Sequence, residues 1–191
     1  MSHRVSLIVG PVESVRGLCG PEPGCRLFSP PLAVAFAVAP VTVGDSANVP
    51  GWIGAELNGR ALTLPETDMR RLAAASARGA LAYVETDYNA GAGYQAAALW
   101  MDGALAFGPE IAWIGEIGWP ISRALDGMGV RADGGDAYAA FGLGEVRSHA
   151  DILETWPEIT GDRVAAPAPG RPKTASAKEP WWLRFLGPRL D

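Results

Sequence analysis

One polar cluster in this sequence combines residue types that acid–base chemistry or protein recognition could use. It holds tyrosines, carboxylates and amides within thirteen positions: Tyr83, Glu85, Asp87, Tyr88, Asn89, Tyr94 and Gln95. Alternate side chains of an extended strand share a face, so Tyr83, Glu85 and Asp87 are expected on one side, with the two carboxylates about 7 Å apart. Paired carboxylates can act as acid and base where their environments separate the two pKa values.

Three interpretations of this cluster remain open at this stage. It is a solvated outer face of an antiparallel strand with a flexible turn, a surface that recognises a partner, or a carboxylate pair of a small enzyme or ligand-binding domain, with His149 as a further member. Gly91-Ala92-Gly93 lacks the Lys-Ser/Thr and the third glycine of phosphate-binding loops. The residues therefore supply no catalytic motif, and a non-enzymatic role is favoured.

The cysteines and histidines do not form a recognisable metal site. Cys19 and Cys25 are separated by Gly-Pro-Glu-Pro-Gly, and no second Cys or His pair completes a zinc ligand set, so no metal and no cofactor are expected. Free thiols are predicted, because a cytosolic protein seldom keeps a disulfide. His149 is expected to cap a helix or lie on the surface, and His3 to be mobile near the chain start.

Charge is unevenly distributed along the chain. The net charge is −5, but residues 1–164 hold 11 Lys+Arg and 19 Asp+Glu, a balance of −8, whereas residues 165–191 hold 5 and 2, a balance of +3. An acidic body repels nucleic-acid phosphates and attracts a basic partner. The simpler explanation is that the negative charge maintains solubility.

Composition sets the class of protein. With 191 residues and 48% hydrophobic residues, the chain can bury a core. Its longest apolar stretch is interrupted by Pro40, so no membrane-spanning helix is expected. The first ten residues lack the long apolar region of a signal peptide, which predicts a cytoplasmic location.

The elements that position the cluster follow from hydrophobic patterning. Residues 5–9 and the alternating stretch 32–39 predict strands, the second at a sheet edge because Pro31 and Pro40 flank it. Thr63 and Glu66 have the spacing of a capping box before a helix that ends near Gly79. A three-stranded antiparallel meander is predicted around residues 80–107, with a type I′ turn at Asp102-Gly103.

Short helices are predicted after the meander. Residues 111–117 carry apolar residues in a broken helical pattern, Pro120 can begin a helix, Asp136 can cap another, and Ser148 with Asp151 repeats the capping spacing. Short helices packed on an antiparallel sheet define an α+β fold.

The chain is predicted to divide into three parts: a single α+β domain over residues 1–164, a Pro/Ala-rich linker over 165–180, and an aromatic basic tail over 181–191. Trp181 and Trp182 in the tail are expected to contact something. The candidates are this protein's own body or a homo-oligomer, another protein, and a membrane surface. A structural assembly module held by this tail is therefore one alternative function.

Several segments together resemble a known group of proteins. These are Ala82-Tyr83-Val84-Glu85-Thr86-Asp87-Tyr88, Gln95-Ala96-Ala97-Ala98-Leu99-Trp100, Gly108-Pro109, Pro120-Ile121-Ser122-Arg123-Ala124-Leu125, Gly129-Val130, Asp136 and Phe141-Gly142-Leu143-Gly144. Over residues 80–156 the chain resembles small bacterial immunity-type proteins found beside polymorphic toxin genes. At Asn89-Ala90 the resemblance predicts an aromatic residue followed by glycine.

The resemblance implies a function rather than a catalytic motif. Immunity-type proteins neutralise a cognate toxin by occluding it, and their acidity matches the basic surface of many toxins. The leading hypothesis is a cytosolic binding protein whose contacts come from the cluster at residues 83–95 and from the Trp-rich tail.

Overall fold

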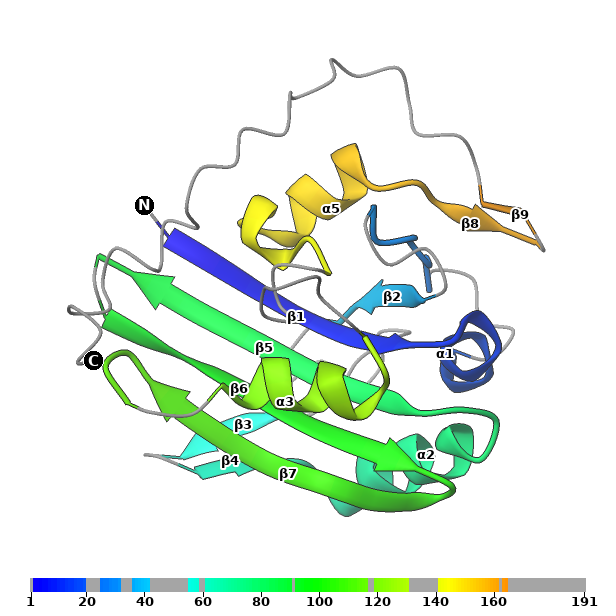
Figure 1. The fold of residues 1–191 in the computed structure, drawn as a ribbon, viewed down its shortest axis with the longest axis horizontal. Helices are drawn as coiled ribbons and strands as arrows, with labels where there is room; N and C mark the ends of the chain where they lie inside the picture. The colour runs from blue at the N-terminus through cyan, green and yellow to red at the C-terminus, as the bar shows by residue number, and fades with distance from the viewer. Residues whose placement is uncertain are drawn as a thin grey trace.

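A five-stranded antiparallel sheet in the order β2-β1-β5-β6-β7 organises the chain (Figure 1). Its strands are β1 (Ser2–Gly10), β2 (Ala37–Pro40), β5 (Leu81–Asn89), β6 (Ala92–Met101) and β7 (Ala104–Trp113). The computed structural model describes residues 2–19, 25–31, 36–41, 55–58, 61–90, 92–116, 119–130, 141–161 and 163–164. The predicted α+β class and the antiparallel meander are confirmed.

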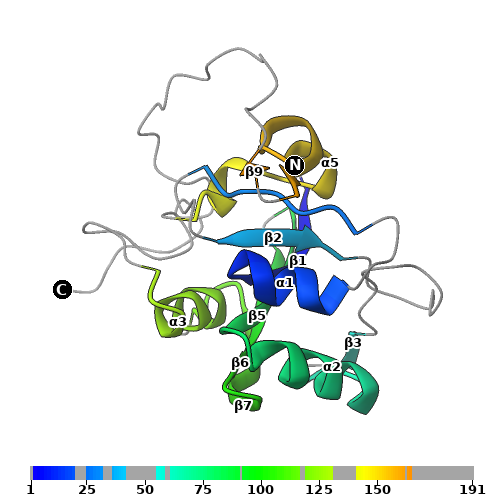
Figure 2. The same cartoon turned by 90° about the vertical axis from the view of Figure 1, so that its right-hand side faces the viewer.

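Helices and short strands cover both faces of this sheet. They are α1 (Val12–Cys19), α2 (Glu66–Ser76), α3 (Pro120–Gly127), the 3-10 helix η1 (Leu143–Glu145), α5 (His149–Thr155), and the pairs β3 (Glu56–Asn58) with β4 (Ala61–Thr63) and β8 (Ile159–Thr160) with β9 (Arg163–Val164). Figure 2 shows α3 on one side of the sheet and α2 with β3 on the other.

Each face of the sheet therefore has its own hydrophobic core. Ala82 and Val84 of β5 join the core beneath α3 and α5, whereas Leu81 and Tyr83 join the core beneath α1 and α2. The central strands are buried on both sides for this reason, and their sequences are largely apolar rather than alternating.

The β6–β7 turn forms as the sequence predicts. Asp102 and Gly103 have φ values of 51° and 81°, and positive φ at both central residues is the signature of a type I′ turn. Strand β7 is longer than predicted, because it continues through Gly108-Pro109 to Trp113. The pairing of β6 with β7 shifts register between Ala97 and Leu99, and an edge strand tolerates proline. Residues 111–113 are part of β7 and 114–116 form a turn, so the predicted helical pattern is wrong there, and residue 117 lies outside the described residues.

Of the helix N-caps predicted at Ser148 and Thr63, the first forms and the second does not. Ser148 caps α5 as expected, since its Oγ accepts the Asp151 N–H at 3.3 Å. The capping box at Thr63 is wrong: Thr63 ends β4, and Pro65 precedes α2 without a side-chain cap. Pro65 directs the chain into α2, and its carbonyl accepts the Asp68 and Met69 N–H groups at 3.0 Å.

Strand β2 lies at the edge of the five-stranded sheet, as its flanking prolines predict. Beyond it, Phe28 bridges Val38, and Glu158 bridges Phe28, so residues near both ends of the described chain extend the sheet by single bridges. Arg26 reinforces this contact through two hydrogen bonds to the Glu158 carboxylate at 2.9 and 2.7 Å. The first half of predicted strand 32–39, the predicted helix at Asp136, the linker and the tail lie outside the described residues.

Two expectations about the cysteines and His3 are wrong. Cys19 and Cys25 form a disulfide with a Cα–Cα distance of 5.7 Å, because α1 ends at Cys19 close to the returning chain at Cys25. His3 is buried in β1, where its Nδ1 lies 2.7 Å from Thr86 Oγ1, because eight residues of β1 pair with β5.

Candidate functional site

The cluster predicted from the sequence is built by the paired strands β5 and β6, and its centre is the Glu85 carboxylate. Glu85 is 4% exposed, and its Oε1 accepts the Tyr94 hydroxyl at 2.6 Å while its Oε2 accepts the Tyr83 hydroxyl. Tyr83 is two residues from Glu85 on the same strand face, and Tyr94 reaches it from β6. Both carboxylate oxygens are therefore occupied inside the protein.

This network strongly favours neutral phenols. Burial, followed by the charge of Glu85, raises the pKa of Tyr83 well above its usual value. Burial and the hydrogen bond to Glu85 also raise the pKa of Tyr94. A phenol that donates to a carboxylate resists ionisation because the phenolate would place two negative charges together. Glu85 thus serves as an internal acceptor, and the interpretation of a solvated strand face does not hold here.

The outer end of the same hairpin is accessible. The side chain of Asp87 is 39% exposed and lies 3.8 Å from the guanidinium of Arg4, which is 67% exposed. Asn89 is exposed at the end of β5, and Ala90 follows it with a φ of 49°. Burial therefore decreases along β5 from Glu85 to Asn89, and the polar residues that a partner could reach are those at the tip.

The opposite face of the hairpin carries a second polar group. Tyr88 and His3 rings lie 6.0 Å apart, and Gln95 Oε1 accepts the N–H of Ile121 at 3.3 Å, which ties the start of α3 to β6. Burial raises the pKa of Tyr88 to about 12, against a smaller lowering by its hydrogen bond with Gln95. Tyr88 is half-buried and Gln95 buried, so this group mainly fastens α3 to the sheet.

His149 lies away from the carboxylate pair. Its Nε2 accepts the backbone N–H of Ser6 at 3.0 Å, and Arg4 donates its backbone N–H to the Arg147 carbonyl at 2.8 Å. These contacts occupy the edge of β1 that β2 does not reach. Burial is the largest cause that lowers the pKa of His149, and the charge of Arg4 lowers it further.

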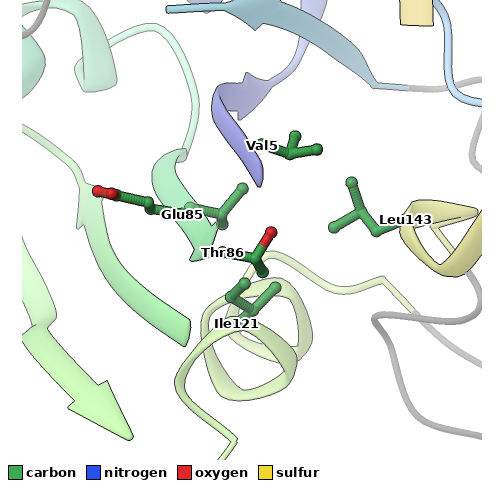
Figure 3. A pocket seen from close by; sticks show the side chains of 6 residues that line it. Val5, Glu85, Thr86, Ile121 and Leu143 are labelled. Atoms are coloured by element: carbon green, nitrogen blue, oxygen red, sulfur yellow. The ribbon is translucent and has the colours of Figure 1, made fainter. Parts of the chain in front are cut away.

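A narrow gap separates the sheet from α3 and η1. Its lining includes Val5, Val84, Thr86, Ile121 and Leu143, and it is too narrow for a water molecule. Glu85 also lines the gap, but Figure 3 shows its carboxylate pointing away from the other lining side chains. The gap therefore does not bring the carboxylate pair to a ligand.

Comparisons with protein families, with curated proteins and with solved structures found no match. Within the part of the chain that the structure describes, no group of three His, Cys, Asp or Glu residues is arranged to hold a metal ion. No helix there has the length and apolar character needed to cross a membrane.

Sequence periodicity correctly placed Tyr83, Glu85 and Asp87 on one face, yet it did not reveal their burial. Arg4, Ser6 and Thr86 were missed because their roles depend on β1 lying beside β5, and no local pattern encodes that pairing. Trp181 and Trp182 of the predicted contact set lie outside the described residues.

Proposed function

We propose that this protein is a cytoplasmic, immunity-type binding protein that neutralises a cognate toxin by covering a basic surface of it. The observation that carries the proposal is the difference in burial between the polar side chains at the two ends of the cluster on β5. Both carboxylate oxygens of Glu85 accept internal hydrogen bonds, whereas the side chains of Asp87 and Asn89 on the same strand are accessible to solvent. A buried, saturated carboxylate suits a scaffold, and an exposed polar tip suits recognition.

The hairpin presents this tip rigidly. Strands β5 and β6 pair residue by residue from Leu81–Trp100 to Asn89–Ala92, and β1 pairs with the other edge of β5 as far as Ser2–Asn89. A pre-ordered surface loses little conformational entropy when it binds, which supports tight association. The binding surface of the proposal is therefore the hairpin tip, defined as Asp87 and Asn89 on one face of β5.

The charge of the body supports a basic partner. Residues 1–164 have a net charge of −8, and the exposed carboxylates of Asp126, Glu145 and Glu154 have no ion-pair partner among the described residues. These carboxylates add to the field that attracts a basic protein and raises its association rate.

The proposal is tested with the product of the neighbouring gene, which the proposal expects to be a toxin with a basic surface. We expect co-expression to restore growth of cells that produce the toxin, and the purified pair to form a stoichiometric complex. The variant Asn89→Lys should weaken the complex at least about tenfold, because it places a positive charge at the tip. Thr67→Lys, which adds the same single positive charge at an exposed position of α2, is the matched control.

Absence of both growth protection and binding would refute the proposal. Equal weakening by Asn89→Lys and Thr67→Lys would refute the hairpin tip as the binding surface, since the effect would then reflect net charge alone.

A further inference from the structure

One half of the outer edge of β7 is closed by its own residues. The N–H of Ile114 donates to the Gly93 carbonyl at 3.0 Å, so Trp113 directs its backbone away from β6. The Trp113 N–H donates to Glu116 Oε2 at 2.9 Å, and its carbonyl accepts the Glu116 N–H. Pro109 has no N–H to offer. Pro109 and Trp113, at the two ends of this half, therefore offer no free N–H to a further strand.

The other half of this edge is open and apolar. Ala104, Leu105 and Ala106 are all exposed, and no described strand pairs with them on this side. Ala104 is the closing residue of a two-residue hairpin and faces Met101, so the next residue, Leu105, directs its N–H outward. Met101 is 37% exposed and Leu105 39% exposed, and they are two of the three large apolar residues exposed in the described chain.

A carboxylate accompanies this apolar edge. Asp102 in the adjoining turn is exposed and has no ion-pair partner in the described residues. By contrast, Arg123 near Phe107 is neutralised by Glu110 at 2.6 Å. The site thus offers apolar contacts, an unpaired backbone donor and uncompensated negative charge.

The sequence contains a segment with the complementary properties. Residues 181–186 read Trp-Trp-Leu-Arg-Phe-Leu, within a region of net charge +3. Sixteen residues separate this segment from Val164, the last described residue of β9. Sixteen residues of polypeptide span about 22 Å as a random coil and about 50 Å when extended, which is comparable with the dimensions of a small domain.

We propose that the segment Trp181–Leu186 docks on the open edge formed by Met101, Ala104, Leu105 and Ala106 of the same chain. Because the segment is tethered to the body, even a low affinity is enough to keep it docked. At an effective concentration of about 1 mM, a segment with a Kd of about 0.1 mM is docked about nine-tenths of the time. This inference concerns a surface away from the hairpin tip and stands independently of the proposed function.

The test is amide exchange in the full chain, followed by NMR. We compare the wild-type protein with the variant Trp181→Ser/Trp182→Ser/Phe185→Ser. The Leu105 amide should exchange about tenfold more slowly in the wild type, the factor expected for nine-tenths occupancy. The amide of Val84, in the centre of the sheet, should exchange equally in both proteins and reports that the fold is intact.

Substitution on the body gives the second arm. Leu105→Arg should release the segment, because it removes an apolar contact and repels basic residues, so the amide at position 105 should exchange as fast as in the triple variant. Leu153→Arg makes the same change at an exposed leucine on α5 and should leave the Leu105 amide as slow as in the wild type. Equal exchange at Leu105 in the wild type and the triple variant would overturn the proposal. A dimer that dissociates in the triple variant would overturn docking within one chain.

Discussion

The backbone N–H of Ser6 donates to Nε2 of His149 at 3.0 Å, across 143 residues of sequence. The same ring nitrogen lies 2.9 Å from the Ser6 carbonyl. A neutral imidazole can accept from the N–H, whereas a protonated ring can only donate to the carbonyl. The protonation state of His149 therefore decides whether the Ser6 N–H keeps its acceptor, whereas the Ser6 carbonyl also accepts the Val41 N–H at 3.0 Å.

Stability should fall as the pH decreases below the ordinary histidine value. Burial lowers the pKa of His149 and of His3 below 6.5, so both rings are preferentially neutral in the folded state. Their contribution is complete above about pH 6.5 and is lost progressively as the pH falls toward their lowered pKa values. His149→Ala should cost about 1–2 kcal/mol near neutral pH and make the acid slope shallower. Urea unfolding at several pH values measures both effects, and an unchanged slope would contradict this role of His149.

Glu85→Gln should destabilise the protein by about 1–3 kcal/mol, because an amide presents one acceptor to two tyrosine hydroxyls that are both donors. Asp87→Asn, the same change two residues further along the strand face, should cost less than about 1 kcal/mol, since its ion pair with Arg4 is exposed. Equilibrium urea unfolding compares the two variants. Equal losses would show that the buried acceptor has no special importance.

The tyrosines of the site should remain neutral in mildly alkaline solution. The pKa values of Tyr83 and Tyr94 are raised by burial and by Glu85, and that of Tyr88 is raised to about 12. Stability from these phenols is present below pH 10 and is lost as the pH rises above it, because the unfolded chain releases its protons first. In an ultraviolet titration, phenolate absorbance from these residues should appear together with unfolding. Early ionisation of all three in the folded protein would be inconsistent with the network.

Ala90→Gly should stabilise the protein by about 0.5–1 kcal/mol, since Ala90 has a left-handed backbone with φ of 49° that glycine adopts without steric cost. Thermal unfolding measures the gain. Ala106→Gly, at an exposed alanine of β7, is the control and should lower stability. A loss of stability in both variants would mean that the turn conformation carries no strain.

Reduction of the Cys19–Cys25 disulfide should lower the free energy of unfolding by about 2 kcal/mol, the loop entropy expected for so short a closed segment. Thermal unfolding with and without reductant measures the loss, and the variant Cys19→Ser/Cys25→Ser should be insensitive to reductant. Two thiols that titrate in the native, unreduced protein would exclude the bond. In a reducing cytoplasm this contribution to stability would be absent.

The sequence predicts local features of this fold better than distant ones. The type I′ turn at Asp102-Gly103, the Ser148 cap and the shared face of Tyr83 and Glu85 follow from spacing within a few residues. Burial of Glu85 could not be predicted, because it depends on Tyr94 from β6 and on the pairing of β1 with β5. The pattern at residues 111–117 was misleading, since a strand buried along one face and a short helix share apolar spacing when glycines interrupt the run.

The contact of Ser6 with His149 can form only late in synthesis, because the two residues are 143 positions apart in the sequence. A nascent chain that has completed the β5–β6–β7 meander can pair β1 with β5, but Arg147 and His149 have not yet been made. Until they emerge, the N–H groups of Arg4 and Ser6 on the outer edge of β1 lack acceptors, and an unpaired edge makes partly made chains prone to aggregate. Truncation before residue 147 should therefore produce insoluble protein rather than a smaller folded domain.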